Sequence, residues 1–574
     1  MSQEDSVDYF REGANAVLRL DYHNALGYFR NVKTFQGVCN TACVMVRLSR
    51  YKEAKAIINE KFAYEVHQEK HKLDSINGLI ALYMGDWKEA KQFLESAFFV
   101  APNDSMCKLN FAKLLRDQDD YDRAIQMARE VVESIKDSND LESSIYRGDA
   151  YRLWCVLLQE TYRYSDFEKV LKEMDRDDLC HVRLVCSANM LKQQGRIHEA
   201  LVGYKKLAES VENDNVLCIM ANIYGSILNK TEIATDMFEK ALKLNPQNPL
   251  VYTMYASMLL NLSKKINHST TDIDHRSIEL RQKACEILNA GHRNRDLDEE
   301  EDLAIALHYA KIARYDGDSL SVFQTLEALC EKFLHNGCPK YLLYNLQVWT
   351  WIYNSDHVSW AWDAFIHISK YEPQTGWEYI KCFDYFRSAI YRFDETKNQE
   401  FYYKNEANWG QVSSAINALV NRGMKVESDH RGVLLWKFIK FVANDFYTKE
   451  VEKTKVLFEK VINAFSFNIP EVYYDYGVFS VRIKEYDNAL KLFSNVLRKN
   501  PNDVLSHLQL AYAYQQLKRI DEARVEYQQA VKSCEDIGND VDMSYFESQL
   551  CKHDHLSMDQ LHFVHDEAVA VLGE

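Results

Sequence analysis

Residues 473–530 read YYDYGVFSVRIKEYDNALKLFSNVLRKNPNDVLSHLQLAYAYQQLKRIDEARVEYQQA. Within this stretch Ala489 and Ala523 lie 34 residues apart, and the residues around them recur in step. The first copy has Tyr473, Tyr476, Gly477, Tyr486, Phe493, Val496 and Pro501, and the second has His507, Leu510, Ala511, Tyr514, Ile520, Tyr527 and Ala530. A fixed period of about 34 residues is typical of a solenoid of helix–turn–helix units. Because one such unit cannot bury its own apolar face, we expect the units to stack into an all-α fold, an α-solenoid.

The same register recurs along much of the chain. Small residues stand at the equivalent position in six further copies, namely Ala25, Ala54, Ala90, Ala124, Ala200 and Ala234. The last two are again 34 residues apart. Repeated matches at one spacing indicate that the solenoid extends well beyond the stretch in which it is clearest.

This pattern resembles the tetratricopeptide repeat family. In that family small residues at positions 8 and 20 let the two helices of a repeat approach closely, an aromatic residue at position 24 fills the remaining gap, and Pro at position 32 ends the second helix. Gly477, Ala489, Phe493 and Pro501 occupy these four positions. The resemblance implies a right-handed superhelix whose concave groove binds helices or peptide segments of other proteins.

Composition agrees with a helical protein. Of the 574 residues only 7 are Pro and 19 are Gly, so few positions interrupt a helix. No apolar run approaches the ~18 residues of a membrane span, and the N-terminus has neither the basic region nor the apolar core of a secretory signal. The 13 cysteines are then expected to be reduced thiols, which predicts a cytoplasmic protein, with the nucleus as the alternative.

The net charge of −16 bears on the class of partner. Nucleic-acid binding draws most of its affinity from Lys and Arg, so a broad phosphate-binding face is not expected. We therefore expect other proteins as partners and no direct contact with nucleic acid.

Clear and degenerate copies alternate along the chain and predict five segments. These are an N-terminal repeat block at 6–135, a second block at 145–291 with a polar insertion at 263–274, degenerate helical repeats rich in Trp and Tyr at 303–440, a C-terminal block at 445–535, and capping helices at 541–574. The insertion is expected to form an exposed loop, because it is polar and long for a turn of the repeat.

One inner face of the predicted superhelix is apolar. Positions 2, 5, 9, 12 and 13 of each first helix line the inside of a tetratricopeptide superhelix, and in the copy that starts at position 215 four of them are Val216, Ile219, Ile223 and Ile227. Their spacing places these aliphatic side chains on one stripe of a helix. Two alternatives follow: a partner helix or peptide lies against the stripe, or neighbouring repeats bury it.

Tryptophan is concentrated in the degenerate segment, where six of the nine residues fall between 349 and 409. Trp360 and Trp362 are two residues apart and so cannot share one face of a helix. At least one of them is expected to face outward or towards a neighbouring element. The cluster is either a partner interface, where Trp and Tyr often dominate the binding energy, or a packed junction between two blocks.

A carboxylate clamp holds the C-terminal tails of Hsp70 and Hsp90 in some tetratricopeptide proteins. Carried onto the first block, its five positions are Phe10, Ala14, Asn40, Lys72 and Ile76. Only Asn40 and Lys72 match the clamp, so binding of these tails is not expected.

Metal ligation is not expected either. Four histidines gather near the C-terminus, at His553, His555, His562 and His565, but no paired CxxC accompanies them. His67 and His71 have the spacing of a zinc protease helix, but Gln68 stands where that motif needs Glu. Cys39 and Cys43, one helical turn apart at inner positions, are expected to be small buried thiols.

The sequence has no glycine-rich phosphate loop and no GxSxG nucleophile elbow, so neither an enzyme nor a cofactor is predicted. We expect a non-enzymatic binding scaffold or adaptor, a subunit of a larger cytosolic or nuclear assembly. The alternative is a subunit of an RNA-processing complex of the half-a-tetratricopeptide type, which residues 434–441, Thr454, Phe458 and 473–476 resemble locally.

Overall fold

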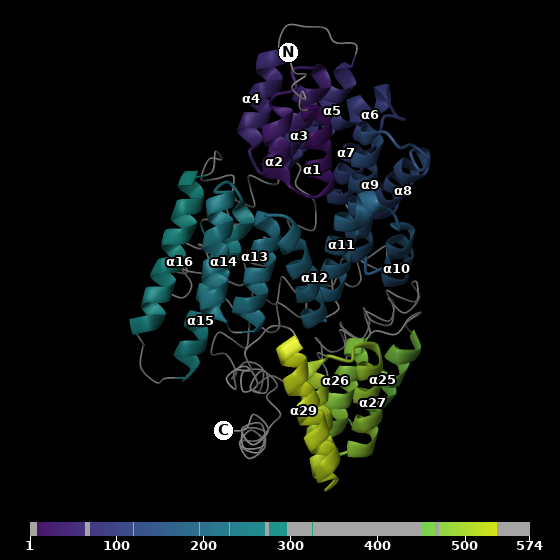
Figure 1. The fold of residues 1–574 in the computed structure, drawn as a ribbon, viewed down its shortest axis with the longest axis vertical. Helices are drawn as coiled ribbons and strands as arrows, with labels where there is room; N and C mark the ends of the chain where they lie inside the picture. The colour runs from purple at the N-terminus through teal and green to yellow at the C-terminus, as the bar shows by residue number, and fades with distance from the viewer. Residues whose placement is uncertain are drawn as a thin grey trace, which may run out of the picture.

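The computed structural model describes residues 8–62, 69–118, 120–193, 196–228, 230–269, 275–294, 451–464 and 470–536, together with residue 324. Every regular element within these ranges is a helix, and no strand occurs in them. The prediction of an all-α solenoid is confirmed. Figure 1 shows the helices lying side by side and following one another along a curved path.

The helices form consecutive pairs in which each first helix packs on the second helix that follows it. In the longer described part the first helices are α1 (Tyr9–Leu18), α3 (Phe35–Arg47), α5 (Lys70–Met84), α7 (Ser105–Asp117), α9 (Leu141–Glu160), α11 (Cys180–Gln193), α13 (Asp214–Asn222) and α15 (Pro249–Ser269). The second helices are α2 (Tyr22–Phe29), α4 (Tyr51–Phe62), α6 (Trp87–Val100), α8 (Tyr121–Ser134), α10 (Tyr164–Glu173), α12 (Ile197–Ser210), α14 (Thr231–Leu244) and α16 (His275–Asn294). Nearer the C-terminus lie α25 (Val451–Ala464), α26 (Pro470–Arg482), α27 (Tyr486–Lys499), α28 (Val504–Gln516) and α29 (Ile520–Asp536).

In two of the repeats, α1–α2 and α26–α27, the helices touch where a glycine of the first helix faces an aromatic ring of the second. A Cβ atom added to Gly13 would lie 2.7 Å from the ring of Phe29, and one added to Gly477 would lie 2.6 Å from the ring of Phe493. Because real Cβ contacts are longer than this, any side chain at either glycine would force the helices apart. Both phenylalanine side chains are consequently buried completely, at 1% and 0% exposure.

The turn inside each repeat has a recurring backbone form. One residue of the turn has a positive φ, between 57° and 65° in Leu20, Ser49, Tyr162, Lys484 and Lys518, and 81° in Gly85. Only glycine adopts this left-handed conformation freely, and other residues lose about 1–2 kcal/mol in it. The packing of the two helices therefore imposes the turn on side chains that do not favour it.

Polar side chains fix where many of the helices begin. Their oxygen atoms accept a hydrogen bond from the backbone N–H three residues further on, at Asp8, Asp21, Thr34, Asp86, Asp104, Asp120, Asp140, Asn213 and Asp503. The first turn of a helix leaves backbone donors without partners, and such a cap is worth about 1 kcal/mol. The repeat thus contains its own start signals.

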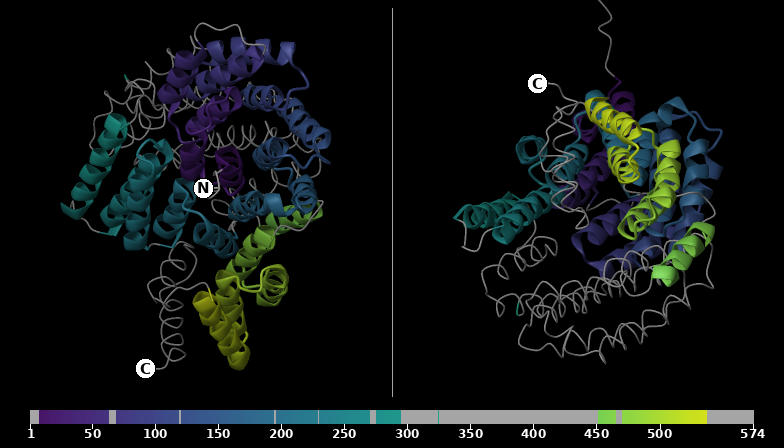
Figure 2. Two further views of the ribbon diagram at one scale, coloured as in Figure 1. Left: turned by 45° about the horizontal axis from the view of Figure 1, so that its top comes forward. Right: turned by 90° about the horizontal axis from the view of Figure 1, so that it is seen from below.

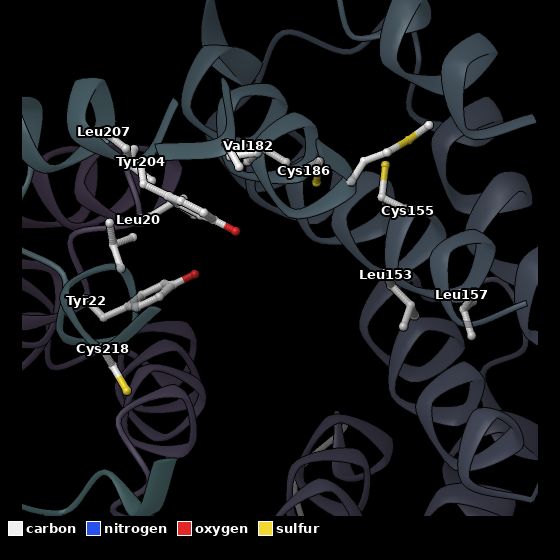
Figure 3. Close-up of a cluster of buried hydrophobic side chains, with 14 of the residues drawn as sticks. Leu20, Tyr22, Leu153, Cys155, Leu157, Val182, Cys186, Tyr204, Leu207 and Cys218 are labelled. Carbon is white, nitrogen blue, oxygen red and sulfur yellow. The ribbon is translucent and has the colours of Figure 1, made fainter. Parts of the chain in front are cut away.

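The curved path brings the start of the chain against its middle. Helix α1 packs on α9, and Figure 2 shows the N-terminal helices against the inner side of the arc that later helices form. Figure 3 shows Leu20 and Tyr22 beside Tyr204 and Leu207 of α12 and Cys218 of α13, all in one buried cluster. The first repeats therefore fill part of the concave side of the later ones.

The polar insertion predicted at 263–274 is wrong in its first half. Helix α15 continues through this segment and ends at Ser269. The segment contains no Gly or Pro that would stop a helix. The buried hydroxyl of Ser263 also lies 2.8 Å from that of Ser277 on α16, which ties the two helices together. Residues 270–274 lie outside the described residues.

Two of the five predicted segments cannot be compared with the structure. Residues 303–440, apart from residue 324, and residues 541–574 lie outside the described residues. The degenerate repeats and the capping helices stay predictions. None of the described helices combines the length and the apolar character that crossing a bilayer requires.

Replacing Ala489 by Arg should destabilise the protein severely. Ala489 is 0% exposed and packs with Phe493 and Leu510. A long cation there has neither room nor a counter-charge, which predicts a loss of about 4 kcal/mol in the free energy of unfolding. Lys491→Arg, at an exposed position of the same helix, should change stability by less than about 0.5 kcal/mol. Thermal unfolding measures both variants, and an unchanged melting temperature for Ala489→Arg would show that the repeat register is wrong.

Candidate functional site

The structure buries part of the apolar stripe that the sequence places on an inner face. Val216 is 3% exposed and Ile223 is 0% exposed, whereas Ile219 is half-buried. These residues belong to or pack against one continuous core cluster. Helix α13 ends at Asn222 and a π-helical turn follows it, in which the side chain of Ile227 lies outside the described residues. Burial by neighbouring repeats is thus the alternative that the structure supports, because Val216 and Ile223 are both buried.

Several other predicted positions fall outside the described residues. These are Trp360 and Trp362, His67 and the four C-terminal histidines. Within the part of the chain that the structure describes, no group of three or more His, Cys, Asp or Glu side chains could hold a metal ion.

The positions of the carboxylate clamp do not form a clamp here. Ala14 and Ile76 are both 0% exposed. The ammonium group of Lys72 lies 2.7 Å from the carboxylate of Glu69, which neutralises its charge. Asn40 remains, and it lines a cavity that is described below.

A buried polar cluster joins the first repeats to the region of α13–α15. Its members, called the clasp below, are each at most 6% exposed: Asn213, Asp214, Asn245 and Asn248. The amide of Asn213 donates to the backbone oxygen of Leu20 at 2.8 Å, and that of Asn245 donates to the backbone oxygen of Leu48 at 3.3 Å. These two oxygens follow α1 and α3, where the end of a helix leaves carbonyl groups without partners. The clasp therefore satisfies them with side chains that lie far along the chain.

Asp214 supplies the charge of the clasp. Its Oδ2 atom accepts hydrogen bonds from Asn245 at 2.8 Å and from Asn248 at 2.7 Å, and the His23 imidazole lies 3.8 Å from Oδ1. Burial alone would raise the pKa of Asp214, but His23 and the two amides favour the carboxylate and lower that pKa overall. The buried carboxylate therefore stays ionised at neutral pH.

A cavity of about 320 Å³ lies inside the turn that the first repeats form. Its walls come mainly from the first helices α1, α3, α5, α7 and α9, and Asn215 of α13 also lines it. Four tyrosines and four charged side chains are among the lining residues, namely Tyr22, Tyr51, Tyr83, Tyr146, Arg47, Lys113, Asp149 and Arg152. This volume is at the low end of the ~300–1,000 Å³ typical of ligand sites. The cavity thus suits a few side chains of a partner segment.

Two arginines share one carboxylate in the wall of the cavity. Asp149 of α9 forms ion pairs with Arg47 of α3 and with Arg152, the latter at 3.2 Å. Both guanidinium groups also donate hydrogen bonds to the hydroxyl of Tyr22. Arg47 in addition lies over the ring of Tyr22, with 5.2 Å between its guanidinium carbon and the ring centroid. The network joins α2, α3 and α9 and gives both arginines an anionic partner.

Lys113 of α7 is the third cation of the cavity. Its Nζ atom donates to Oδ1 of Asn110 at 3.0 Å, and no ion pair joins it to a carboxylate of the described residues. Burial lowers the pKa of Lys113 to about 8, Asp149 opposes this shift, and Arg47 and Arg116 add to it. Among the described lining residues, three cations thus face one carboxylate, which leaves the cavity with an excess of positive charge.

The cysteines near the cavity are not set up to react. Cys39 is 0% exposed, and burial raises the pKa of Cys43 to about 11 although Arg47 and Lys113 oppose this shift. Since the thiolate is the nucleophile and metal ligand, both groups are inert at neutral pH. The expectation of a small buried thiol is confirmed for Cys39, whereas Cys43 is only half-buried and lines the cavity.

The sequence pattern did not predict this cavity, although two of its cations stand at positions that face inward in the repeat. Lys113 stands at inner position 9 of the copy with Ala124, and Arg47 at inner position 13 of the copy with Ala54. The charged residues at the inner positions of each copy, and not only the apolar residues, therefore indicate these two cations. Asp149 could not be found in this way, because α9 belongs to a divergent repeat.

Three segments match the tetratricopeptide repeat family: residues 105–137, 215–248 and 484–533. They coincide with the pair α7 and α8, the pair α13 and α14, and the run from α27 to α29. The chain therefore contains tetratricopeptide repeats, as its sequence pattern predicted. None of the curated proteins compared with it is significantly similar in sequence.

Solved structures of low sequence identity resemble the chain over most of its length. A human IFIT1 dimer with PPP-AAAA is 14% identical, with 92% of this chain and 95% of that one covered and a TM-score of 0.34. A monomeric mutant of IFIT1 with Gppp-AAAA is 15% identical, with the same coverage and a TM-score of 0.35. The APC/C hetero-tetramer Cut9-Hcn1 is 12% identical, with 100% and 97% covered and a TM-score of 0.31. These scores are low, so the fold assignment rests on the repeats and helix pairs themselves.

Replacing Ile219 and Ile223 together by Ser should destabilise the protein. Ile223 is completely buried and Ile219 packs against the core, so the change predicts a loss of about 4 kcal/mol or more in the free energy of unfolding. The matched control replaces Val202 and Ile233 by Ser, because these aliphatic side chains are 38% and 42% exposed. Thermal unfolding of the two double variants should separate them clearly. Equal melting temperatures would mean that the stripe faces an open groove after all.

Replacing Lys113 by Met should stabilise the protein at neutral pH. The pKa of Lys113 is lowered to about 8 from an ordinary 10.5, so the folded state binds its proton less well than the unfolded state. The cost is complete below pH 8, declines as the pH rises from 8 to 10.5, and is absent above that range. We expect the variant to gain about 1–3 kcal/mol at pH 7 and to lose this advantage by pH 10.5.

Denaturant unfolding at several pH values tests the Lys113 prediction. Lys91→Met serves as the control, because Lys91 is an exposed lysine on α6. The control should show no such pH-dependent gain. A stability difference between Lys113→Met and wild type that is constant from pH 7 to 10.5 would contradict the assigned environment of Lys113.

Proposed function

We propose that this protein is a non-enzymatic binding scaffold, a subunit of a larger cytosolic or nuclear assembly, and that it holds a segment of a partner protein in the cavity of its N-terminal turn. The observation that carries this proposal is the composition of the cavity wall, to which five successive first helices contribute. Inner faces of such helices are where a superhelix receives helices or extended peptides.

The chemistry of the wall supports recognition more than catalysis. Tyrosines offer flat apolar area with a polar hydroxyl, a combination that is enriched where proteins bind one another. Asp149 is paired with two guanidinium groups, and the Cys43 thiol remains protonated at neutral pH. Among the described lining residues neither group is poised to act as a base or a nucleophile.

The cysteines support the proposed compartment. Eight of the 13 cysteines have side chains that the structure describes, and these eight are free thiols. Thiols persist in the cytosol and nucleus, whereas extracellular proteins tend to form disulfides. The proposal therefore places the scaffold in a reducing compartment.

A photo-crosslinker in the cavity wall tests the proposed function. Tyr83 lines the cavity and is 48% exposed, so p-benzoyl-phenylalanine at this position should crosslink a bound partner. The control places the same group at Phe99, which is 88% exposed and does not line the cavity. We expect a protein adduct from position 83 in extracts of cells that express the protein, and none of that mass from position 99.

Nuclease treatment of the same extracts decides between the two classes of partner. A protein adduct at position 83 that survives the treatment supports the scaffold. An adduct that contains RNA, or that is lost with nuclease, would favour the half-a-tetratricopeptide alternative predicted from residues 434–476. The same adducts from both positions, or none from position 83, would contradict binding in the cavity.

A further inference from the structure

The positive charge of the cavity is not distributed evenly. Arg47 and Arg152 are held by Asp149 and Tyr22, so neither guanidinium group is free to take a ligand without breaking that network. Lys113 differs from both arginines. Its hydrogen bond to Asn110 joins it to a neutral oxygen, and no carboxylate of the described residues forms an ion pair with it. The carboxylate of a ligand would neutralise the charge of Lys113 at this point of the wall.

Asn40 of α3 supplies a second observation that points to a ligand. It lines the same cavity as Lys113. Its Oδ1 atom accepts a hydrogen bond from Gln36 at 3.1 Å, which fixes the orientation of the amide. Its Nδ2 atom is inaccessible and has no hydrogen-bond partner among the described residues. A donor in this position is costly unless an acceptor reaches it, so the wall contains an unused cation and an unused amide donor.

The Lys113 ammonium group and the Asn40 amide favour a carboxylate over a phosphate. The two guanidinium groups, whose fork geometry would suit a phosphate, are already committed to Asp149. One ammonium group and one amide donor match the single charge and the two oxygens of a carboxylate. Tyr51 and Tyr83 line the cavity as a stacked pair, with ring centroids 5.9 Å apart and planes inclined by 4°. Flat apolar area of this kind favours aromatic or aliphatic neighbours beside the carboxylate.

We propose that Lys113 and Asn40 bind the carboxylate of an acidic side chain in the partner segment that the cavity holds. This inference rests on the proposed function and gives its ligand a chemical class. The site differs from the clamp positions considered in the sequence, of which Lys72 is neutralised by Glu69 and only Asn40 reaches the cavity. Lys113 must be protonated for this role, so binding should weaken as the pH rises above the pKa of that group.

The groups that face Lys113 set the pH range of this effect. They are Asp149 of α9, Arg47 and Cys43 of α3, and Arg116 on the same helix as Lys113. Burial disfavours the charge of Arg47 and of Arg116, but Asp149 and Glu160 outweigh it and raise both pKa values, so both arginines stay protonated through pH 6–10. Cys43 has a pKa of about 11 and remains neutral in this range. Lys113 is therefore the group among them that titrates near pH 8.

Short peptides test the carboxylate directly on the full-length protein. The probe is acetyl-Phe-Glu-Phe-amide, and the matched control is acetyl-Phe-Gln-Phe-amide, which has the same shape without the charge. Binding is followed by protection of Lys113 from trace acetylation with acetic anhydride, in which the amine forms an amide and releases acetate and a proton. Mass spectrometry quantifies the modified Lys113 against the exposed Lys91 as internal reference.

We expect the Glu peptide to protect Lys113 at a concentration at least about tenfold lower than the Gln peptide, as one charge-assisted hydrogen bond implies. Acetyl-Phe-Gln-Phe with a free C-terminal carboxylate distinguishes the source of the carboxylate, and it should protect less well than the Glu peptide. Equal protection by the Glu and Gln peptides overturns the proposal. Stronger protection by the C-terminal carboxylate or by inorganic pyrophosphate also overturns it.

Two variants distinguish an error in the carboxylate site from an error in the proposed scaffold function. Asn40→Leu removes the free donor but keeps Lys113 as the reporter, and it should raise the protecting concentration about tenfold. Lys113→Gln should weaken the photo-crosslink from position 83 without changing the helical signal in circular dichroism. A crosslink that is present in wild type and equally strong in both variants leaves the scaffold standing and overturns the carboxylate site. A wild-type protein that forms no crosslink at position 83 contradicts the proposed function itself.

Discussion

Where Gly13 faces Phe29, and again where Gly477 faces Phe493, the two helices of a repeat approach too closely for any side chain on the first of them. In these two pairs the contact sets the distance between the helices, and the stacking of such pairs on one another builds the solenoid. In the turns of the same two pairs, Leu20 and Lys484 adopt a left-handed conformation that glycine prefers. Every later feature, including the cavity, requires this spacing to be kept.

The curvature of the stack alone would leave an open groove. The clasp joins the first two repeats to the region of α13–α15. Asn213 and Asn245 donate to backbone oxygens of the first two repeats, and Asp214 organises both amides by accepting hydrogen bonds from Asn245 and Asn248. A buried carboxylate is tolerated only when donors surround it, so these partners are needed together. Val216 and Ile223 are buried in the same core cluster, and their helix α13 packs against α12, α14 and α15.

The cavity retains charges that the fold does not need. Arg47, Asp149 and Arg152 form a network that joins three helices and so contributes to structure. Lys113 makes no such connection, and burial disfavours its charge and lowers its pKa. Residues that oppose stability in this way are typical of sites under functional demand. The unpaired amide of Asn40 in the same wall has the same character.

The sequence by itself determined the class of fold, because the steric demand of each helix pair is local. A small residue, an aromatic and a proline at fixed spacing describe one repeat completely, as Gly477, Phe493 and Pro501 illustrate. The segment predicted as a loop at 263–274 is helical as far as Ser269, because polar residues alone do not end a helix and the segment has no Gly or Pro.

The site was decided by tertiary structure. Arg47 and Asp149 are 102 residues apart, and Asn213 and Leu20 are 193 apart, so no periodicity of 34 residues relates them. Their contacts depend on the curvature accumulated over several repeats, and a small change per repeat would separate them. Sequence periodicity fixes which face of each helix points inward, whereas only the closed path fixes which inward faces meet.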